Sequence, residues 1–102
     1  MEPNVPAVLV RAARRIEIAV TEKGWEPDHV TVHKGEAVRF VFTRKTEKTC
    51  VKELILYIGE EDKVMRELPL NQPVEIVTAF RNAGTLGFTC GMTMKNGVIT
   101  IQ

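Results

Sequence analysis

The sequence predicts an all-β fold, an antiparallel Greek-key β-sandwich or barrel. Short segments with apolar residues at every second position recur along the chain, and this period of two is typical of half-buried strands. Glycine, proline and asparagine separate these segments at spacings of a few residues. No segment shows a sustained helical period with caps, and the nearest candidate, residues 8–15, lacks a clear N-cap. Several short strands in this arrangement indicate a sandwich or barrel.

The first half of the chain supplies three of the predicted strands. The first, residues 16–20, ends before a break at Gly24 to Pro27. The second, residues 30–32, has its two valines on one face and His29 and His33 on the other. A turn at Lys34-Gly35 leads to the third strand, residues 38–43, which we expect to be central. Polar residues then form a loop that ends at Cys50.

The second half of the chain supplies four more strands, which we expect at residues 54–58, 64–68, 74–78 and 98–101. An acidic turn around residues 59–62 separates the first two. Asn82-Ala83-Gly84 predicts another turn, and residues 87–89 lead directly into Cys90. Asn96-Gly97 is typical of a hairpin turn, because both residues tolerate a positive φ. The last strand therefore begins at residue 98.

The composition indicates one ordinary globular domain. The chain has 102 residues, of which 44% are hydrophobic and 26% charged. We assign residues 1–14 to an N-terminal extension and residues 15–102 to the domain. Since 14 Lys and Arg are interleaved with 13 Asp and Glu, the formal net charge is only +1. This balance argues against a surface for nucleic acid.

The N-terminus shows no segment suited to membrane insertion. Its apolar run covers only residues 6–10, too short for a signal-peptide core or a membrane helix. We therefore expect no membrane segment and a cytoplasmic protein, as given. We also expect a monomer. A signal or anchor trimmed from the chain would instead imply an extracytoplasmic, membrane-anchored protein.

Three sulfur atoms occur within the stretch Cys90-Gly91-Met92-Thr93-Met94. In an extended chain, positions 90, 92 and 94 lie on the same side, and Gly91 lets the backbone bend between them. A methionine in a small β protein usually fills the core, as we expect for Met65. Met92 and Met94 instead lie in a predicted loop beside a cysteine. We interpret them as metal ligands.

The second cysteine, Cys50, lies far upstream, and we expect the fold to return it to Cys90. One interpretation is a disulfide, which would stabilise a loop of this size by roughly 4 kcal/mol in an oxidising compartment. The other is a pair of thiolates that binds metal together with Met92 and Met94. An immunoglobulin-type bridge is disfavoured, because Trp25 precedes both cysteines.

The softness of these donors indicates which metal they would bind. Two thiolates and two thioethers suit monovalent copper, whereas zinc seldom accepts a thioether. A blue-copper electron-transfer centre needs two imidazoles beside the thiolate, and no histidine follows Cys90. We interpret His29 and His33 as surface residues. The donor set favours reduced copper, which suits carriage better than redox cycling.

Four short motifs carry a resemblance to a known family. They are Gly-aromatic-x-Pro, Cys-x-x-Glu, Glu-Leu-Pro-Leu and Gly-Phe-x-Cys-Gly-Met-x-Met. They lie at Gly24, Trp25 and Pro27; at Cys50 and Glu53; at Glu67 to Leu70; and at Gly87 to Met94. With these motifs, residues 16–101 resemble the small bacterial cupredoxin-like Cu(I)-binding domains. Proteins of this type are membrane-anchored copper chaperones or are appended to copper-exporting P-type ATPases.

The resemblance implies a function in copper homeostasis. Cys50 and Cys90 would form a tight thiolate site, and Met92 and Met94 a weaker site beside it. One or two Cu(I) ions would bind per monomer. The protein would pass Cu(I) by ligand exchange to a copper-exporting P-type ATPase or another copper carrier.

Two other functions stay open, an electron-transfer cupredoxin that holds Cu(II) and a metal-free, disulfide-stapled β-sandwich that acts as a binding module. We expect no enzyme, because the sequence shows no nucleophile-base pair, no evidently positioned acids and no phosphate loop. Beside the ligands, Gly91 would give the backbone room. Glu53 would be either an acceptor behind the ligands or a plain surface carboxylate.

Overall fold

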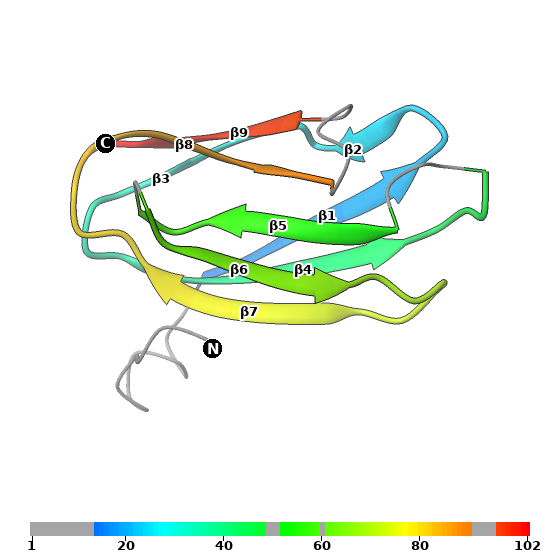
Figure 1. Cartoon of the computed structure of the whole chain (residues 1–102). Helices are drawn as coiled ribbons and strands as arrows, with labels where there is room; N and C mark the ends of the chain where they lie inside the picture. Colours follow the sequence, from blue (N-terminus) through cyan, green and yellow to red (C-terminus); the bar gives the residue numbers. More distant parts are fainter. Residues whose placement is uncertain (1–13, 49–51, 60, 91–95) are drawn as a thin grey trace.

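Two β-sheets face each other in the computed structural model, which describes residues 14–48, 52–59, 61–90 and 96–102 (Figure 1). One sheet has the strand order β2-β1-β4-β7 and the other the order β3-β9-β8-β5-β6. The first sheet consists of β1 (Arg14–Thr21), β2 (Gly24–Glu26), β4 (Ala37–Arg44) and β7 (Val74–Ala79). The second consists of β3 (His29–Val32), β5 (Glu53–Tyr57), β6 (Lys63–Glu67), β8 (Gly84–Thr89) and β9 (Asn96–Ile101). The predicted all-β sandwich is confirmed.

The core lies between the sheets and follows the period-two pattern of the sequence. In β4, for example, Val38, Phe40 and Phe42 all point inward and are fully buried. As predicted, β4 is central in its sheet, because it pairs with β1 on one side and β7 on the other. Each sheet therefore contributes one apolar face to a single core.

Two strand pairs depart from a purely antiparallel arrangement. β1 runs parallel to β4, with Ile16 opposite Phe40, and β3 runs parallel to β9, with Val30 opposite Ile99. Parallel neighbours require a connection that crosses the molecule, since a short hairpin joins only antiparallel strands. The alternation of apolar residues carries no information on strand direction, so the sequence could not indicate these pairs.

Two short strands were missing from the prediction. Gly24 to Pro27, expected as a break, includes β2, which directs Trp25 into the core with only 5% of its surface exposed. Residues 84–89, expected as a turn and a lead-in to Cys90, form β8, which pairs with both β5 and β9. Both strands contain glycine, which lowers strand propensity and conceals the alternation.

The expected hairpin turn at Asn96-Gly97 is wrong, because both residues already belong to β9. Gly97 lies opposite Phe88 on β8. A Cβ at position 97 would come within 2.1 Å of the Phe88 ring. Glycine is needed here for the close approach of an aromatic ring, not for a turn.

Met65 was expected in the core but is 54% exposed. It lies on β6, where its neighbour Val64 takes the inward position and is buried. Since successive strand residues point to opposite faces, Met65 faces outward.

No helix forms in the described ranges, so none of them contains a helix long and apolar enough to span a membrane.

Candidate metal centre

The connections that carry the predicted sulfur ligands start and end at the same end of the sandwich. β4 and β8 both end, and β5 and β9 both begin, on the right-hand side of Figure 1. The antiparallel pairing of β5 with β8 sets Ile55 opposite Thr89, beside the end of β8. The start of β5, shortly after Cys50 in the chain, therefore lies next to Cys90.

Cys90 directly follows β8 and belongs to the hydrophobic core, with none of its surface exposed. It continues the inward face of the strand, because Phe88 two positions earlier is also buried in that core. A thiol at this position is screened from water. Cys90 is therefore the core residue that directly precedes segment 91–95 in the chain.

Three aromatic rings pack together in the core that Cys90 joins. The Phe88 ring makes an edge contact with Trp25, at 5.0 Å between ring centroids, and another with Phe42, at 5.5 Å. Trp25 also contacts Phe42 at 5.8 Å. Such edge-to-face pairs add to the stabilisation from buried area alone. They give the end of β8 a rigid apolar support from both sheets.

A side-chain hydrogen bond joins the two strands that flank the segment 90–95. The hydroxyl of Thr89 donates to Oδ1 of Asn96 at 2.6 Å, and these residues are also register partners on β8 and β9. The same hydroxyl lies 3.3 Å from the carbonyl oxygen of Cys90. Sequence reasoning missed this bond, because the pairing of Thr89 with Asn96 depends on the register of β8, a strand it did not predict.

The connection between β4 and β5, which includes Cys50, is held by the main chain of Leu68. The Leu68 carbonyl accepts a 2.7 Å hydrogen bond from Nε of the partly buried Arg44. The Leu68 amide donates to the carbonyl of Lys52 at 2.9 Å. Arg44 also donates to the Thr46 carbonyl at 3.3 Å. Leu68 thus contacts both ends of this connection.

Of the other predicted site residues, only Glu53 is described by the structure. The described residues do not include Cys50, Gly91, Met92 or Met94. Glu53 is exposed at the start of β5 and lies opposite Glu67 on β6. Its neighbour Leu54 points into the core and is fully buried, so Glu53 points to the outer face. Cys90 points to the opposite, inner side.

The two histidines do not gather around Cys90. Both are exposed, and Nε2 of His29 lies 2.8 Å from the hydroxyl of Thr100. Among the described residues, no three His, Cys, Asp or Glu side chains form a group that could hold a metal ion. The pair of imidazoles that a blue-copper centre requires is therefore not assembled at this cysteine.

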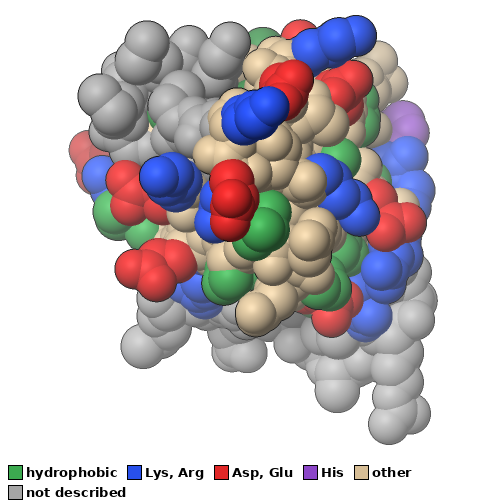
Figure 2. Space-filling model, turned by 90° about the vertical axis from the view of Figure 1, so that its right-hand side faces the viewer, with side chains coloured by type: hydrophobic (Ala, Val, Ile, Leu, Met, Phe, Trp, Pro, Cys, Tyr) green, Lys and Arg blue, Asp and Glu red, His purple; other side chains and the backbone are tan. Residues whose placement is uncertain are grey.

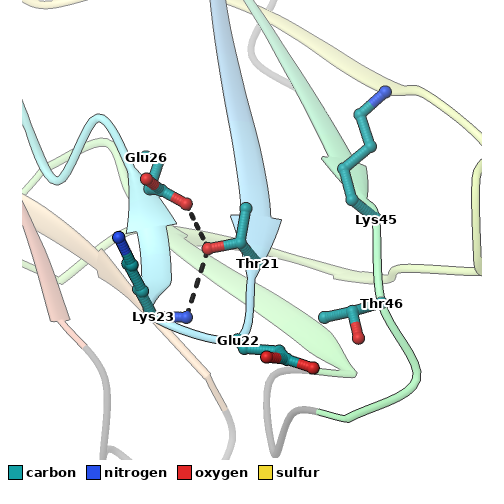
Figure 3. Close-up of a pocket in the computed structure, with 6 residues that line it drawn as sticks. All are labelled: Thr21, Glu22, Lys23, Glu26, Lys45 and Thr46. Atoms are coloured by element: carbon teal, nitrogen blue, oxygen red, sulfur yellow. Dashed lines mark hydrogen bonds between the residues drawn. The ribbon is translucent and has the colours of Figure 1, made fainter.

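A surface depression of about 350 Å³ lies where β1, β2 and the end of β4 meet (Figure 3). The Thr21 hydroxyl accepts a hydrogen bond from the Lys23 amide at 3.2 Å and donates to the Glu26 carboxylate. The side chains that line the depression offer oxygen and nitrogen atoms and no sulfur. They are Thr21, Glu22, Lys23, Glu26, Lys45 and Thr46. These hard donors do not suit Cu(I).

Charge is mixed on the end of the sandwich that faces the viewer in Figure 2. Lys and Arg side chains alternate there with Asp and Glu, and hydrophobic side chains lie between them. A field of one sign is what a phosphate backbone would require. The surface seen in this view does not provide one.

Comparison with known proteins agrees with the architecture. The sequence model of the cupredoxin-like domain family matches residues 6–101. No curated protein sequence matches the chain significantly. Among solved structures, auracyanin B has a similar fold, with a TM-score of 0.68, at 12% identity over 98% of this chain and 92% of that one.

Two solved structures are more similar in sequence. The first is a copper binding protein in its apo form, 25% identical, with a TM-score of 0.74 and a coverage of 86% of each chain. The second is the metal binding domain of the Cu(I) exporting P-type ATPase CopA from Streptococcus pneumoniae D39, with Cu(I). It is 30% identical, with a TM-score of 0.74, and the match covers 86% of this chain and 84% of that domain.

Proposed function

Because this chain belongs to the cupredoxin-like domain family, we propose that it binds copper(I) and carries it in copper homeostasis, as a copper chaperone. The ligands are the sulfur atoms of Cys50, Cys90, Met92 and Met94. The observation that supports this proposal most strongly is the pairing of β5 with β8, which brings the chain that follows Cys50 next to Cys90. The two cysteines are distant in sequence, yet the described strands converge where they would need to meet.

Chain length limits how far Cys50 can lie from this point. Cys50 is two residues before Lys52, whose carbonyl is hydrogen-bonded to Leu68. Two residues of extended chain span at most about 7 Å. The Cys50 thiol, at most two residues from Lys52, can therefore approach the beginning of β5, and hence the end of β8. The distance that Cys50 can cover from Lys52 is compatible with both metal binding and a disulfide. A thiol count distinguishes the two.

The environment of Cys90 suits a reduced metal. The side chain is fully buried beside an aromatic cluster, so a metal bound to it is screened from water on the core side. The soft thiolate and thioether donors favour Cu(I) over harder ions. The two histidines, which electron transfer through a blue-copper centre would need, do not gather with Cys90 into a metal-binding group. Binding and release without a change in oxidation state therefore fit these residues best.

Transfer would proceed by ligand exchange. An incoming thiolate of a partner forms a bond to Cu(I) as one thioether bond breaks, and copper keeps its oxidation state throughout. Since Cys90 is closed to solvent, exchange begins at the weaker ligands Met92 and Met94, and Cys90 is released last. The partner is a copper-exporting P-type ATPase or another copper carrier. The similarity to a domain of a Cu(I) exporting ATPase supports this choice.

Anaerobic titration against a Cu(I) chelator tests the proposal. We expect Cys50→Ser and Cys90→Ser each to weaken binding by more than about 100-fold, because losing a group that only supports a ligand already costs 10–100-fold. A Met92→Leu/Met94→Leu variant should keep the tight site and lose the second equivalent of copper. Affinity should rise with pH for the thiolate site, since binding releases the thiol protons, and hardly change for the thioethers.

The same samples separate the alternatives. Unchanged affinity in both serine variants would overturn the proposal. An intense visible absorption after addition of Cu(II) would indicate an electron-transfer centre instead. A count of thiols on the non-reduced protein after unfolding in urea addresses the disulfide, which requires that neither cysteine reacts. Unfolding is needed because Cys90 is fully buried in the folded chain.

A further inference from the structure

The Thr89 side chain lies where it can control the geometry of Cys90. It directly precedes Cys90, is only 6% exposed, and its hydroxyl donates to Asn96 Oδ1 at 2.6 Å. This separation lies at the short end of the range for O–H···O hydrogen bonds. The bond closes a ring that contains the chain from Thr89 through Cys90 to Asn96. It therefore adds a side-chain link to the main-chain pairing of the same two residues, across the ends of the segment with three of the proposed ligands.

The hydroxyl also lies close to the peptide group of the proposed ligand itself. Its oxygen is 3.3 Å from the Cys90 carbonyl oxygen. A hydroxyl has one proton, so the shorter contact, with Asn96, takes the stronger bond. Thr89 thus joins the position directly before Cys90 to the return of the chain at β9.

Such a constraint matters for metal affinity more than for folding. Cu(I) binding orders the side chains and backbone that supply its ligands, and a segment whose ends are already fixed loses less freedom on binding. Asn96 is exposed, so water can satisfy its side chain if the bond to Thr89 is removed. The strands β8 and β9 also remain paired through their main chains. Removing the hydroxyl should leave the fold intact.

We propose that Thr89 is a positioning residue of the copper site, which sets the geometry of Cys90 through its hydrogen bond to Asn96 before the metal binds. This inference rests on the proposed function. Groups that orient metal ligands without binding the metal typically contribute 10–100-fold in affinity. We expect a contribution of about tenfold from Thr89.

The test compares Cu(I) affinity in three variants with that of the wild-type chain. Thr89→Val removes the hydroxyl with little change in shape and should weaken Cu(I) binding about tenfold. Thr89→Ser keeps the hydroxyl and should restore most of the affinity. Thr100→Val is the matched control. It removes a threonine hydroxyl that contacts His29 at 2.8 Å on the same sheet, where Thr100 pairs with Thr85 and not with the end of β8.

Urea unfolding, followed by the fluorescence of the single tryptophan Trp25, shows whether each variant is folded. Equal affinity of Thr89→Val and wild type would overturn this inference and leave the proposed function standing. An equal loss of affinity in Thr100→Val would also overturn it, because affinity would then follow general stability. If Thr89→Val fails to fold, Asn96→Ala removes the same bond from an exposed position and should give the same loss. A wild-type chain that binds no Cu(I) would instead overturn the proposed function, and this inference with it.

Discussion

The two connections proposed to carry sulfur ligands lie at one end of the sandwich but are held in different ways. Segment 90–95 joins β8 and β9, which pair directly, so its ends are fixed by a local register and by the Thr89–Asn96 bond. The connection with Cys50 joins β4 and β5, which belong to different sheets. Its ends contact Leu68, which is distant in sequence from Arg44. The position of Cys90 thus depends on one hairpin, whereas the two ends of the connection with Cys50 are joined through a separate segment of the chain.

This difference has a consequence for the site. A change inside the β8–β9 hairpin should disturb the cysteine and both methionines together. A change at Arg44 or Leu68 should disturb Cys50 alone. The following variants test how strongly the contacts of each region stabilise the fold, in order of decreasing effect.

The largest effect is expected within the hairpin, from Gly97→Ala. The new Cβ would lie 2.1 Å from the Phe88 ring, which is buried against Trp25 and Phe42. Because the ring has to move within a packed core, we expect a loss of about 1–3 kcal/mol in the free energy of unfolding. Urea unfolding measures it. Gly59→Ala is the control, since its Cβ would only reach Asp62 Oδ2 at 3.4 Å. A Gly97→Ala chain as stable as this control would contradict the close packing of the hairpin.

A smaller effect is expected from Arg44→Lys, at the base of the other connection. Lysine cannot present Nε and a terminal nitrogen in the same fixed fork, so the bonds to Leu68 and Thr46 are not both kept. We expect a loss of about 1 kcal/mol in the free energy of unfolding. Arg81→Lys, at an exposed position after β7, should change it by less than about 0.5 kcal/mol. Equal effects of the two substitutions would show that Arg44 does not fix this connection.

The smallest effect is expected from Glu53→Gln. Glu53 lies directly opposite Glu67, and like charges at such cross-strand positions are destabilising. Removing one charge should raise the free energy of unfolding by roughly 0.2–1 kcal/mol and leave Cu(I) affinity unchanged. Glu75→Gln should act in the opposite direction, because Glu75 lies 3.6 Å from Arg39. A loss of Cu(I) affinity of tenfold or more in Glu53→Gln would instead make this carboxylate a support of the ligands.

Several features of the fold could be predicted because they depend on local patterns. Alternation along residues 16–20, 38–43 and 54–58 identified β1, β4 and β5, including the central position of β4. The same alternation would have shown that Val64 and not Met65 is buried on β6, since the two cannot share a face. β2 and β8 contain glycines, and their stability comes from neighbouring strands rather than from their own composition.

The chemistry of the proposed site follows from the order of residues alone, because that order specifies the kind and spacing of the side chains. A cysteine followed by two methionines at alternate positions offers soft donors in any fold. The folded arrangement, in contrast, brings the chain after Cys50 beside Cys90 and buries Cys90 fully. It does so because the pairing of β5 with β8 joins segments far apart in the chain. Such a pairing depends on how two whole sheets bury their apolar faces, and no local pattern encodes it.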